Sequence, residues 1–179
     1  MKVSIIAAIG KNKELGKDNK LIWHIKEDLQ RFRNLTKWHP IIMGRKTWDS
    51  LPLKPLLNRT NIVITRDLSF SLAGGRLAKL ARSLEDAIEI AKKKKGSEEI
   101  FIIGGGQIFK EAMEKKLVDK LYLTIVEARL PSPEGEANGG QGDFDADTFF
   151  PDYSNFKKVV FEQSGESGGY KYKFLELTR

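Results

Sequence analysis

Four short, almost unbroken apolar segments constrain the fold of this chain more than any other feature of its sequence. They cover 3–9 (VSIIAAI), 40–43 (PIIM), 61–65 (NIVIT) and 100–103 (IFII). A strand with one face in water alternates apolar and polar residues, whereas a strand buried on both faces is apolar throughout. The chain is therefore expected to build a sheet that is covered on both faces and contains parallel strands.

Further strands and helices are expected around these segments. The additional strands are expected at 76–81, 120–128, 156–163 and 170–177. The last two of these alternate in the way that half-exposed antiparallel strands do. Apolar residues at helical spacing predict helices at 25–37, 45–51, 83–95 and 106–116. We therefore predict a single α/β domain over residues 1–179, with about four helices flanking a central mixed sheet of about eight strands, largely parallel with antiparallel strands at the C-terminus.

A segment at 131–147 (PSPEGEANGGQGDFDAD) stands apart from this pattern. It is rich in Gly, Pro and acidic residues and poor in apolar ones. Such a composition is typical of loops. We therefore expect a mobile loop inserted within the domain.

The composition excludes several kinds of protein. The 179 residues include no cysteine and only two histidines, His24 and His39, so no disulfide framework, thiolate chemistry or metal site is expected. No apolar run approaches the roughly 18 residues that a membrane span requires. The N-terminus lacks the apolar core and cleavage site of a signal peptide. We expect a cytoplasmic protein that does not contact a membrane.

The net charge of +7 raises the question of an anionic partner. The densest basic run, 92–95, ends a predicted helix that begins at Ser83 and carries acidic residues in its first turn. This order of charges complements the helix dipole, so we interpret the run as a solvated helix end rather than as a binding patch. Basic and aromatic residues are not interleaved as nucleic-acid binding would require. A small anionic ligand is the alternative left open.

Two junctions join an apolar strand to a helix through glycine. The triplet Gly104–Gly106 follows the strand at 100–103, although glycine weakens both kinds of element. Gly44 leads in the same way into the run Arg45–Thr47. Such a junction presents unpaired N–H groups to a phosphate, yet Phe109 replaces the third glycine of the dinucleotide fingerprint, and the early glycine of a P-loop is absent. Two phosphate contacts to one extended ligand, or two tight turns, both remain open.

One acidic residue falls on the apolar side of a predicted helix. Ile25, Leu29, Phe32 and Leu35 form a stripe at about 100° per residue, and Asp28 falls inside it. The polar residues that fall outside the stripe are Lys26, Glu27, Gln30 and Asn34. A buried carboxylate is costly without a partner. Asp28 is therefore expected to pair with a buried arginine, to cap a neighbouring segment, or to be tuned for acid–base chemistry.

Seven sequence blocks, taken in order, resemble the dihydrofolate reductase family. They are SIIAAI, LGKDNKLIWHIKEDLQRF, PIIMGRKTWDSL, NRTNIVITR, IFIIGGGQIF, LYLT and DTFFPD. The blocks span nearly the whole chain, and their combination is far more specific than any single motif. The resemblance implies a bacterial-type enzyme in which NADPH gives a hydride to C6 of 7,8-dihydrofolate while a proton reaches N5, supplying tetrahydrofolate to one-carbon metabolism. It also implies a monomer that binds small molecules, antifolates among them, and no nucleic acid.

The resemblance also implies roles for individual residues. Asp28 matches the lone carboxylate of the pterin pocket, and Thr124 matches the hydroxyl that supports it. Leu21 matches a residue of the loop over the nicotinamide, and Trp23 matches the tryptophan beneath that loop. Arg59 matches the arginine that binds the α-carboxylate of the substrate's glutamate. The implied substrate-binding residues are Ile6, Asp28, Leu29, Phe32, Arg33, Leu51, Leu56, Arg59, Ile103 and Thr124.

Both glycine junctions belong to the implied NADPH site. Gly104 and Gly105 let the backbone approach the nicotinamide and pyrophosphate, and the helix from Gly106 presents its N–H groups. Basic and hydroxyl residues after the strands match contacts to the pyrophosphate and the adenosine 2′-phosphate. The implied cofactor-binding residues are Ala8, Leu15, Gly16, Asn19, Leu21, Gly44, Arg45, Lys46, Thr47, Thr65, Arg66, Ile103, Gly104, Gly105, Gly106, Gln107, Ile108 and Phe109.

Some positions depart from the family pattern. Ile22 replaces a proline before the tryptophan, and Leu57 and Asn58 replace the usual Pro-Gly before the arginine. Phe109 replaces a common tyrosine, and Ala146 replaces a glycine. These changes bear on loop motion and turnover rather than on the class of reaction.

Two other functions stay open at this point. One is a reductase of the same fold that acts on a ribosylated pyrimidine in riboflavin synthesis, although Asp28 together with Arg59 argues against it. The other is a basic binding protein that keeps the fold without catalysis and binds nucleic acid with a steep salt dependence. An assay of NADPH oxidation with dihydrofolate separates these alternatives.

Overall fold

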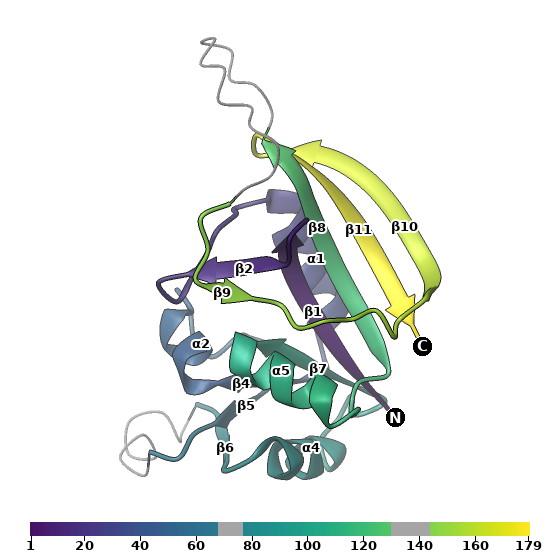
Figure 1. The fold of residues 1–179 in the computed structure, drawn as a ribbon. Coiled ribbons are helices and arrows are strands. Elements are labelled where there is room, and N and C mark those ends of the chain that lie inside the picture. Colours follow the sequence, from purple (N-terminus) through teal and green to yellow (C-terminus); the bar gives the residue numbers. More distant parts are fainter. Residues whose placement is uncertain (68–76, 130–143) are drawn as a thin grey trace.

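The computed structural model describes residues 1–67, 77–129 and 144–179. An eight-stranded sheet runs through the molecule (Figure 1). In spatial order its strands are β10 (Lys158–Ser167), β11 (Tyr170–Thr178), β8 (Lys120–Arg129), β1 (Lys2–Gly10), β7 (Glu99–Gly104), β4 (Pro40–Gly44), β5 (Thr60–Ile64) and β6 (Lys79–Ala81). The pairs β10–β11 and β11–β8 are antiparallel, and the other neighbours are parallel. The predicted mixed sheet with antiparallel C-terminal strands is confirmed.

The helices of the described ranges cover both faces of this sheet. They are α1 (Lys26–Thr36), α2 (Arg45–Ser50), α4 (Leu84–Lys92) and α5 (Gly106–Glu114). α4 and α5 pack on one face, and α1 and α2 pack on the other. Along β4, Ile42 joins the core on the α4–α5 side, while Ile41 and Met43 join the core on the α1–α2 side. The unbroken apolar runs therefore reflect strands that are buried on both faces, as predicted.

The four predicted helices occur, and each ends one to three residues earlier than expected. α4 begins at the predicted N-cap, where the Ser83 hydroxyl accepts a hydrogen bond from the Asp86 N–H at 3.1 Å. It ends at Lys92, because the N–H groups of the next two lysines bond to carbonyls three residues back instead of four. The basic run is thus the end of a helix.

The sequence pattern does not predict a second, three-stranded sheet. Its order is β3 (Lys20–Leu21), β2 (Glu14–Lys17) and β9 (Thr148–Phe149). β2 pairs with β9 through Glu14 opposite Phe149 and Gly16 opposite Thr148. Strands of two to four residues carry too little periodicity to be recognised, and this pairing joins segments more than 130 residues apart.

Other expectations are corrected or fall outside the described ranges. β10 is exposed along most of its length rather than half-buried, because it is the outermost strand of the sheet. The strand expected at 76–81 is seen over Lys79–Ala81, since residues 68–76 are not described. Most of the loop expected at 131–147 falls on residues 130–143, which also lie outside the described ranges.

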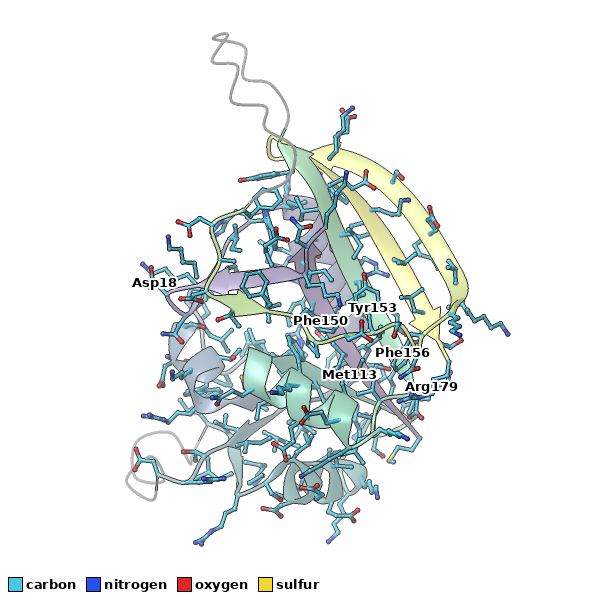
Figure 2. The ribbon with its side chains drawn as sticks, in the orientation of Figure 1. Asp18, Met113, Phe150, Tyr153, Phe156 and Arg179 are labelled. Atoms are coloured by element: carbon cyan, nitrogen blue, oxygen red, sulfur yellow. The ribbon has the colours of Figure 1, made fainter. Side chains whose placement is uncertain are left out.

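The chain between β9 and β10 runs alongside α5 (Figure 2). Phe150 packs on Phe109 of α5 with ring centroids 5.3 Å apart, and Tyr153 packs on Phe150 at 6.0 Å. At the C-terminus the guanidinium of Arg179 lies 4.6 Å from the Phe156 ring. The Phe150–Phe109 contact thus anchors this segment on α5. Within the described ranges, no helix has the length and apolar character needed to cross a membrane.

Candidate active site

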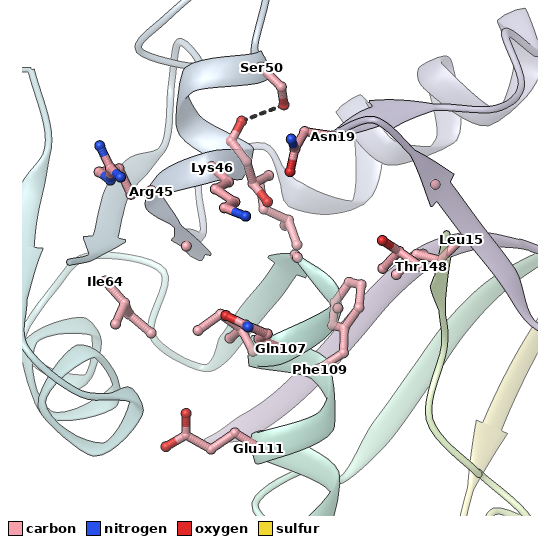
Figure 3. A pocket seen from close by; sticks show the side chains of 18 of the residues that line it. Leu15, Asn19, Arg45, Lys46, Ser50, Ile64, Gln107, Phe109, Glu111 and Thr148 are labelled. Carbon is pink, nitrogen blue, oxygen red and sulfur yellow. Dashed lines mark hydrogen bonds between the residues drawn. The ribbon is translucent and has the colours of Figure 1, made fainter. Parts of the chain in front are cut away.

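A cleft of about 830 Å³ opens where β4, β5 and β7 end and α2 and α5 begin (Figure 3). Its walls come from these strand ends, from both glycine junctions and from the small sheet. Open α/β sheets bind their ligands at the carboxyl ends of the parallel strands. The cleft is therefore placed where an extended ligand would bind.

The implied cofactor residues gather in this cleft. All of them except Ala8 line it, in four groups: Leu15, Gly16, Asn19 and Leu21; Gly44, Arg45, Lys46 and Thr47; Thr65 and Arg66; and the run from Ile103 to Phe109. Ala8 lies on β1 opposite Thr124 and packs in the apolar cluster around Trp23 instead.

Several lining residues were not singled out by sequence reasoning. They are Lys20, Ser50, Ile64, Arg82, Ser83, Glu111 and Thr148. Of these, Arg82 could have been suspected from the sequence, because it is a cation directly before the predicted N-cap Ser83. Thr148 reaches the cleft only because β9 pairs with β2, and no local sequence pattern reveals that pairing.

The glycine triplet is required by the packing of the protein itself. Gly104 has a φ of +137°, which residues with side chains rarely adopt. A Cβ at Gly104 or Gly105 would lie 3.2 Å from Thr47 Oγ1, and one at Gly106 would lie 2.7 Å from Thr148 Cγ2. The peptide bond between Gly104 and Gly105 is cis. Bare backbone therefore forms the cleft wall where α5 begins, and the first N–H groups of a helix have no acceptor within it.

The charged residues that line the cleft are mostly cations. They are Lys20, Arg45, Lys46, Arg66 and Arg82, with Glu111 as the acid. Arg45 and Lys46 project from the start of α2 (Figure 3), and Arg45 also lies 3.7 Å from the partly exposed Asp67 carboxylate. This excess of positive charge suits an anionic ligand such as a phosphate.

Asp28 is half-buried on α1 and accepts a hydrogen bond from Thr124 Oγ1 at 2.5 Å. Burial raises the pKa of the Asp28 carboxyl, and this effect outweighs the Thr124 hydrogen bond and the charge of Arg31, which both lower it. The hydrogen-bond partner is therefore a hydroxyl on β8 and not a buried arginine. An acid whose pKa is raised by burial is common at catalytic sites.

An apolar wall lies under α1 and α2 and reaches the cleft. The implied substrate residues that pack in this one cluster, under α1 and α2, are Ile6, Phe32, Leu51, Leu56 and Ile103. Ile103 also lines the cleft, so the cluster and the cleft are continuous. Leu29, at the edge of the α1 stripe, is 43% exposed and stays outside the core.

Arg59 is held in place by three hydrogen bonds. Its Nε donates to Thr36 Oγ1 at 2.8 Å. Its Nη1 and Nη2 donate to the carbonyls of Leu57 and Arg33, at 2.7 and 3.3 Å. Asn58 has a φ of +59°, a left-handed conformation that asparagine tolerates better than most residues. The Leu57–Asn58 replacement is therefore compatible with the turn that carries Arg59.

Leu21, at the end of β3, and Trp23, two residues later, lie in opposite environments. Trp23 is buried and lies edge-on to Phe144, with ring centroids 4.9 Å apart. Among the described residues, its Nε1 has no hydrogen-bond partner. Leu21, in β3, is exposed and lines the cleft. Ile22, in the place of the proline, packs against the cluster of Trp23.

Asp147 ties the turn between β2 and β3 to the chain before β9. Its carboxylate accepts hydrogen bonds from the Asp18 N–H at 2.9 Å and the Thr148 hydroxyl at 2.7 Å. Its own N–H donates to the Gly16 carbonyl at 3.1 Å. The bonds from Asp18 and Thr148 lower the pKa of Asp147, so the carboxylate stays charged over a wider pH range.

The sequence was compared with known proteins. A family model described as "Dihydrofolate reductase" matches residues 2–179. The dihydrofolate reductase of Neisseria gonorrhoeae is 44% identical over 178 residues, which cover 98% of this chain and 96% of that protein. The dihydrofolate reductase of Neisseria meningitidis serogroup B is 39% identical over 182 residues, covering 100% and 99%. That of Bacillus subtilis is 36% identical over 177 residues, covering 97% and 92%.

Proposed function

This chain belongs to the dihydrofolate reductase family, and we propose that it catalyses the NADPH-dependent reduction of 7,8-dihydrofolate to 5,6,7,8-tetrahydrofolate. Membership makes it an oxidoreductase, and neither the pyrimidine reductase nor the non-catalytic binding protein is favoured. The observation that carries the proposal is the half-buried Asp28, held by Thr124 beside an apolar wall that continues into the cleft.

Asp28 is proposed to orient the pterin ring. The Thr124 hydrogen bond uses one acceptor site of the carboxylate, and we assign the remaining acceptor sites to the N3 and 2-amino groups of the substrate. The negative charge of the carboxylate then favours a proton on N5. Bound NADPH supplies the hydride that reduces C6.

The lining of the cleft supports the assignment of NADPH as the cofactor. The bare backbone of Gly104 and Gly105 suits close approach of the nicotinamide and pyrophosphate, and the N-terminus of α5 suits the pyrophosphate. We assign the adenosine 2′-phosphate to Arg45, Lys46 and Arg66, which all line the cleft. Leu21 and Trp23 are assigned to the loop over the nicotinamide and its support.

The apolar wall and Arg59 are proposed to hold the rest of the substrate. Ile6, Leu29, Phe32 and the other apolar residues of the implied substrate set would contact the pterin and benzoyl rings. Three of the five N–H groups of Arg59 hold its guanidinium in place. The remaining two can bind the α-carboxylate of the glutamate through a planar fork. Arg33 lies beside it as a second cation.

The proposal extends to the cellular setting. We propose a cytoplasmic monomer that works on small molecules, supplies one-carbon metabolism and binds antifolates in the pterin pocket. It is not expected to bind nucleic acid. Its support is the family membership, together with a site built for small anionic ligands.

The proposal is tested by the oxidation of NADPH with two candidate substrates and by a separate assay of nucleic-acid binding. Rapid oxidation with dihydrofolate, and none with a ribosylated aminopyrimidine, is the expected result. Turnover of the pyrimidine alone would assign the riboflavin pathway instead. NADPH binding without any turnover, together with salt-dependent binding of nucleic acid, would indicate a binding protein.

A further inference from the structure

A cluster of three charged side chains lies under α1, beyond the residues assigned above. Arg31 Nη2 donates to Glu176 Oε1 at 3.0 Å, and Lys120 Nζ lies 2.7 Å from Glu176 Oε2. The three side chains are only 12–17% exposed. Two cations share one carboxylate, so the cluster carries an excess of one positive charge.

The strand register places this cluster beside the Asp28–Thr124 pair. On β8, Tyr122 and Thr124 point to the same face of the sheet, because residues two apart in a strand do so. Their partners on β11 are Glu176 and Phe174. Glu176 is therefore two residue pairs along the sheet from Thr124, the donor to Asp28, and on the same face.

The Arg31 guanidinium is fixed between that sheet face and the helix. Its centre lies 4.8 Å from the ring of Phe174 and 5.6 Å from the ring of Tyr122. Arg31 follows Asp28 by three residues on α1, a spacing that puts two side chains on neighbouring parts of the helix surface. The cation is thus fixed on the same side of α1 as the proposed acid.

From this geometry we infer that Arg31 is a positioning residue for the proposed reaction, and that its charge, balanced against Glu176 and Lys120, favours the carboxylate form of Asp28. The inference rests on the proposed function for its catalytic meaning, but the charge interaction itself does not. Burial raises the pKa of Asp28, and the Arg31 charge opposes that effect.

Other ionisable groups around Asp28 do not supply this charge. From β11, Tyr172 is buried, and the pKa of its hydroxyl is raised by burial and by the charges of Glu27 and Asp28. From β8, burial raises the pKa of Tyr122 as well. Glu27, next to Asp28 on α1, is exposed and negative. Arg31 is therefore the cation that acts on Asp28 directly. Glu176 and Lys120 act through Arg31, because Glu176 pairs with both cations.

The test is a pH titration of the Asp28 carboxyl by carbon NMR in the ligand-free protein, with the resonance assigned from its loss in Asp28→Asn. Arg31→Met is expected to move the midpoint to higher pH, because it removes the opposing cation. Glu176→Gln is expected to move it to lower pH, because Arg31 and Lys120 lose their shared counter-charge. Arg31→Lys keeps the charge and is expected to restore the midpoint toward wild type.

The two shifts in opposite directions distinguish charge from packing. Lys115→Met serves as the control. Lys115 follows α5, on the sheet face opposite α1, and pairs with Glu85 and Glu111 at 2.6 Å. If Arg31→Met does not fold, Lys120→Met tests the same upward shift. Shifts in one direction only, or no larger than the control, would overturn the inference. Opposite NMR shifts in a protein that does not reduce dihydrofolate would uphold the charge interaction and refute the proposed function.

Discussion

Asp28→Asn isolates the charge of the proposed acid from its shape. The amide has the size of the carboxylate, and its oxygen can still accept the 2.5 Å hydrogen bond from Thr124 Oγ1. The substitution removes the negative charge that would favour a proton on the substrate's N5. NADPH affinity is expected to stay unchanged, because Asp28 does not line the cofactor cleft.

Asp28→Asn is expected to lower the reaction rate strongly and to cost little stability. A positioned acid–base group contributes about 10²–10⁴ in rate, which corresponds to about 2.7–5.5 kcal/mol of activation free energy. Burial raises the pKa of Asp28 in the folded state. Protonation of Asp28 therefore stabilises the folded state. This stabilisation is complete below the ordinary aspartate pKa and is lost as pH rises through the raised pKa of Asp28. Asp28→Asn is thus expected to be at least as stable as wild type at neutral pH.

The assay is the rate of hydride transfer measured over a pH series in single turnovers. The deficit of Asp28→Asn is expected to shrink at acid pH, where solvent can protonate the substrate directly. Glu27→Gln is the matched control, because Glu27 is the neighbouring acid, is exposed and falls outside the apolar stripe of α1. A variant that matches wild type at neutral pH would remove Asp28 from the mechanism, and loss of activity in Glu27→Gln would transfer the role to that residue.

Three further predictions concern the cofactor cleft and the small sheet. NADPH is expected to be preferred over NADH by at least about tenfold in kcat/KM, or about 1.4 kcal/mol, and Lys46→Met to reduce this ratio; equal use of both cofactors by wild type would contradict the assignment. Gly106→Ala is expected to lower the melting temperature, because its Cβ would lie 2.7 Å from Thr148 Cγ2, and Thr148→Ser should then recover much of the loss; a double variant no better than the single one would locate the strain elsewhere. Asp147→Asn is expected to speed hydrogen exchange at the Asp18 N–H. In wild type, protection should be complete above the ordinary aspartate pKa and disappear as pH falls through the lowered pKa of Asp147; equal exchange in both proteins would show that the carboxylate does not hold this turn.

The parts of the fold that local patterns specify were predicted correctly. Strands buried on both faces must be apolar throughout, so 40–43 and 100–103 could be recognised without any knowledge of their partners. The start of α4 followed from Ser83 and the acids after it. The small sheet escaped prediction because Glu14 finds its partner at Phe149, and only the folded chain brings the two together.

The candidate site shows the same division. The helical wheel places Asp28 among apolar residues, and the family resemblance supplies Thr124 as its partner. Arg31 also falls beside Asp28 on that wheel, yet a single arginine on a helix is usually solvated. Its burial depends on Glu176, 145 residues away, and on the rings of β8 and β11. Such a charge cluster is visible only after the strand register is known.

The position of β1 in the sheet has a consequence for how the protein is made. β1 is the first strand to leave the ribosome, yet its neighbours are β7 and β8, whose pairing with it extends to Val126. At about 5–20 residues per second, the residues between Gly10 and Val126 take about 6–23 s to synthesise. The nascent chain therefore carries an apolar strand with at least one open edge during this time, and pairing over such a long sequence separation is slow. Chaperone dependence should accordingly be greatest for chains stalled before β8 and should fall once that strand has emerged.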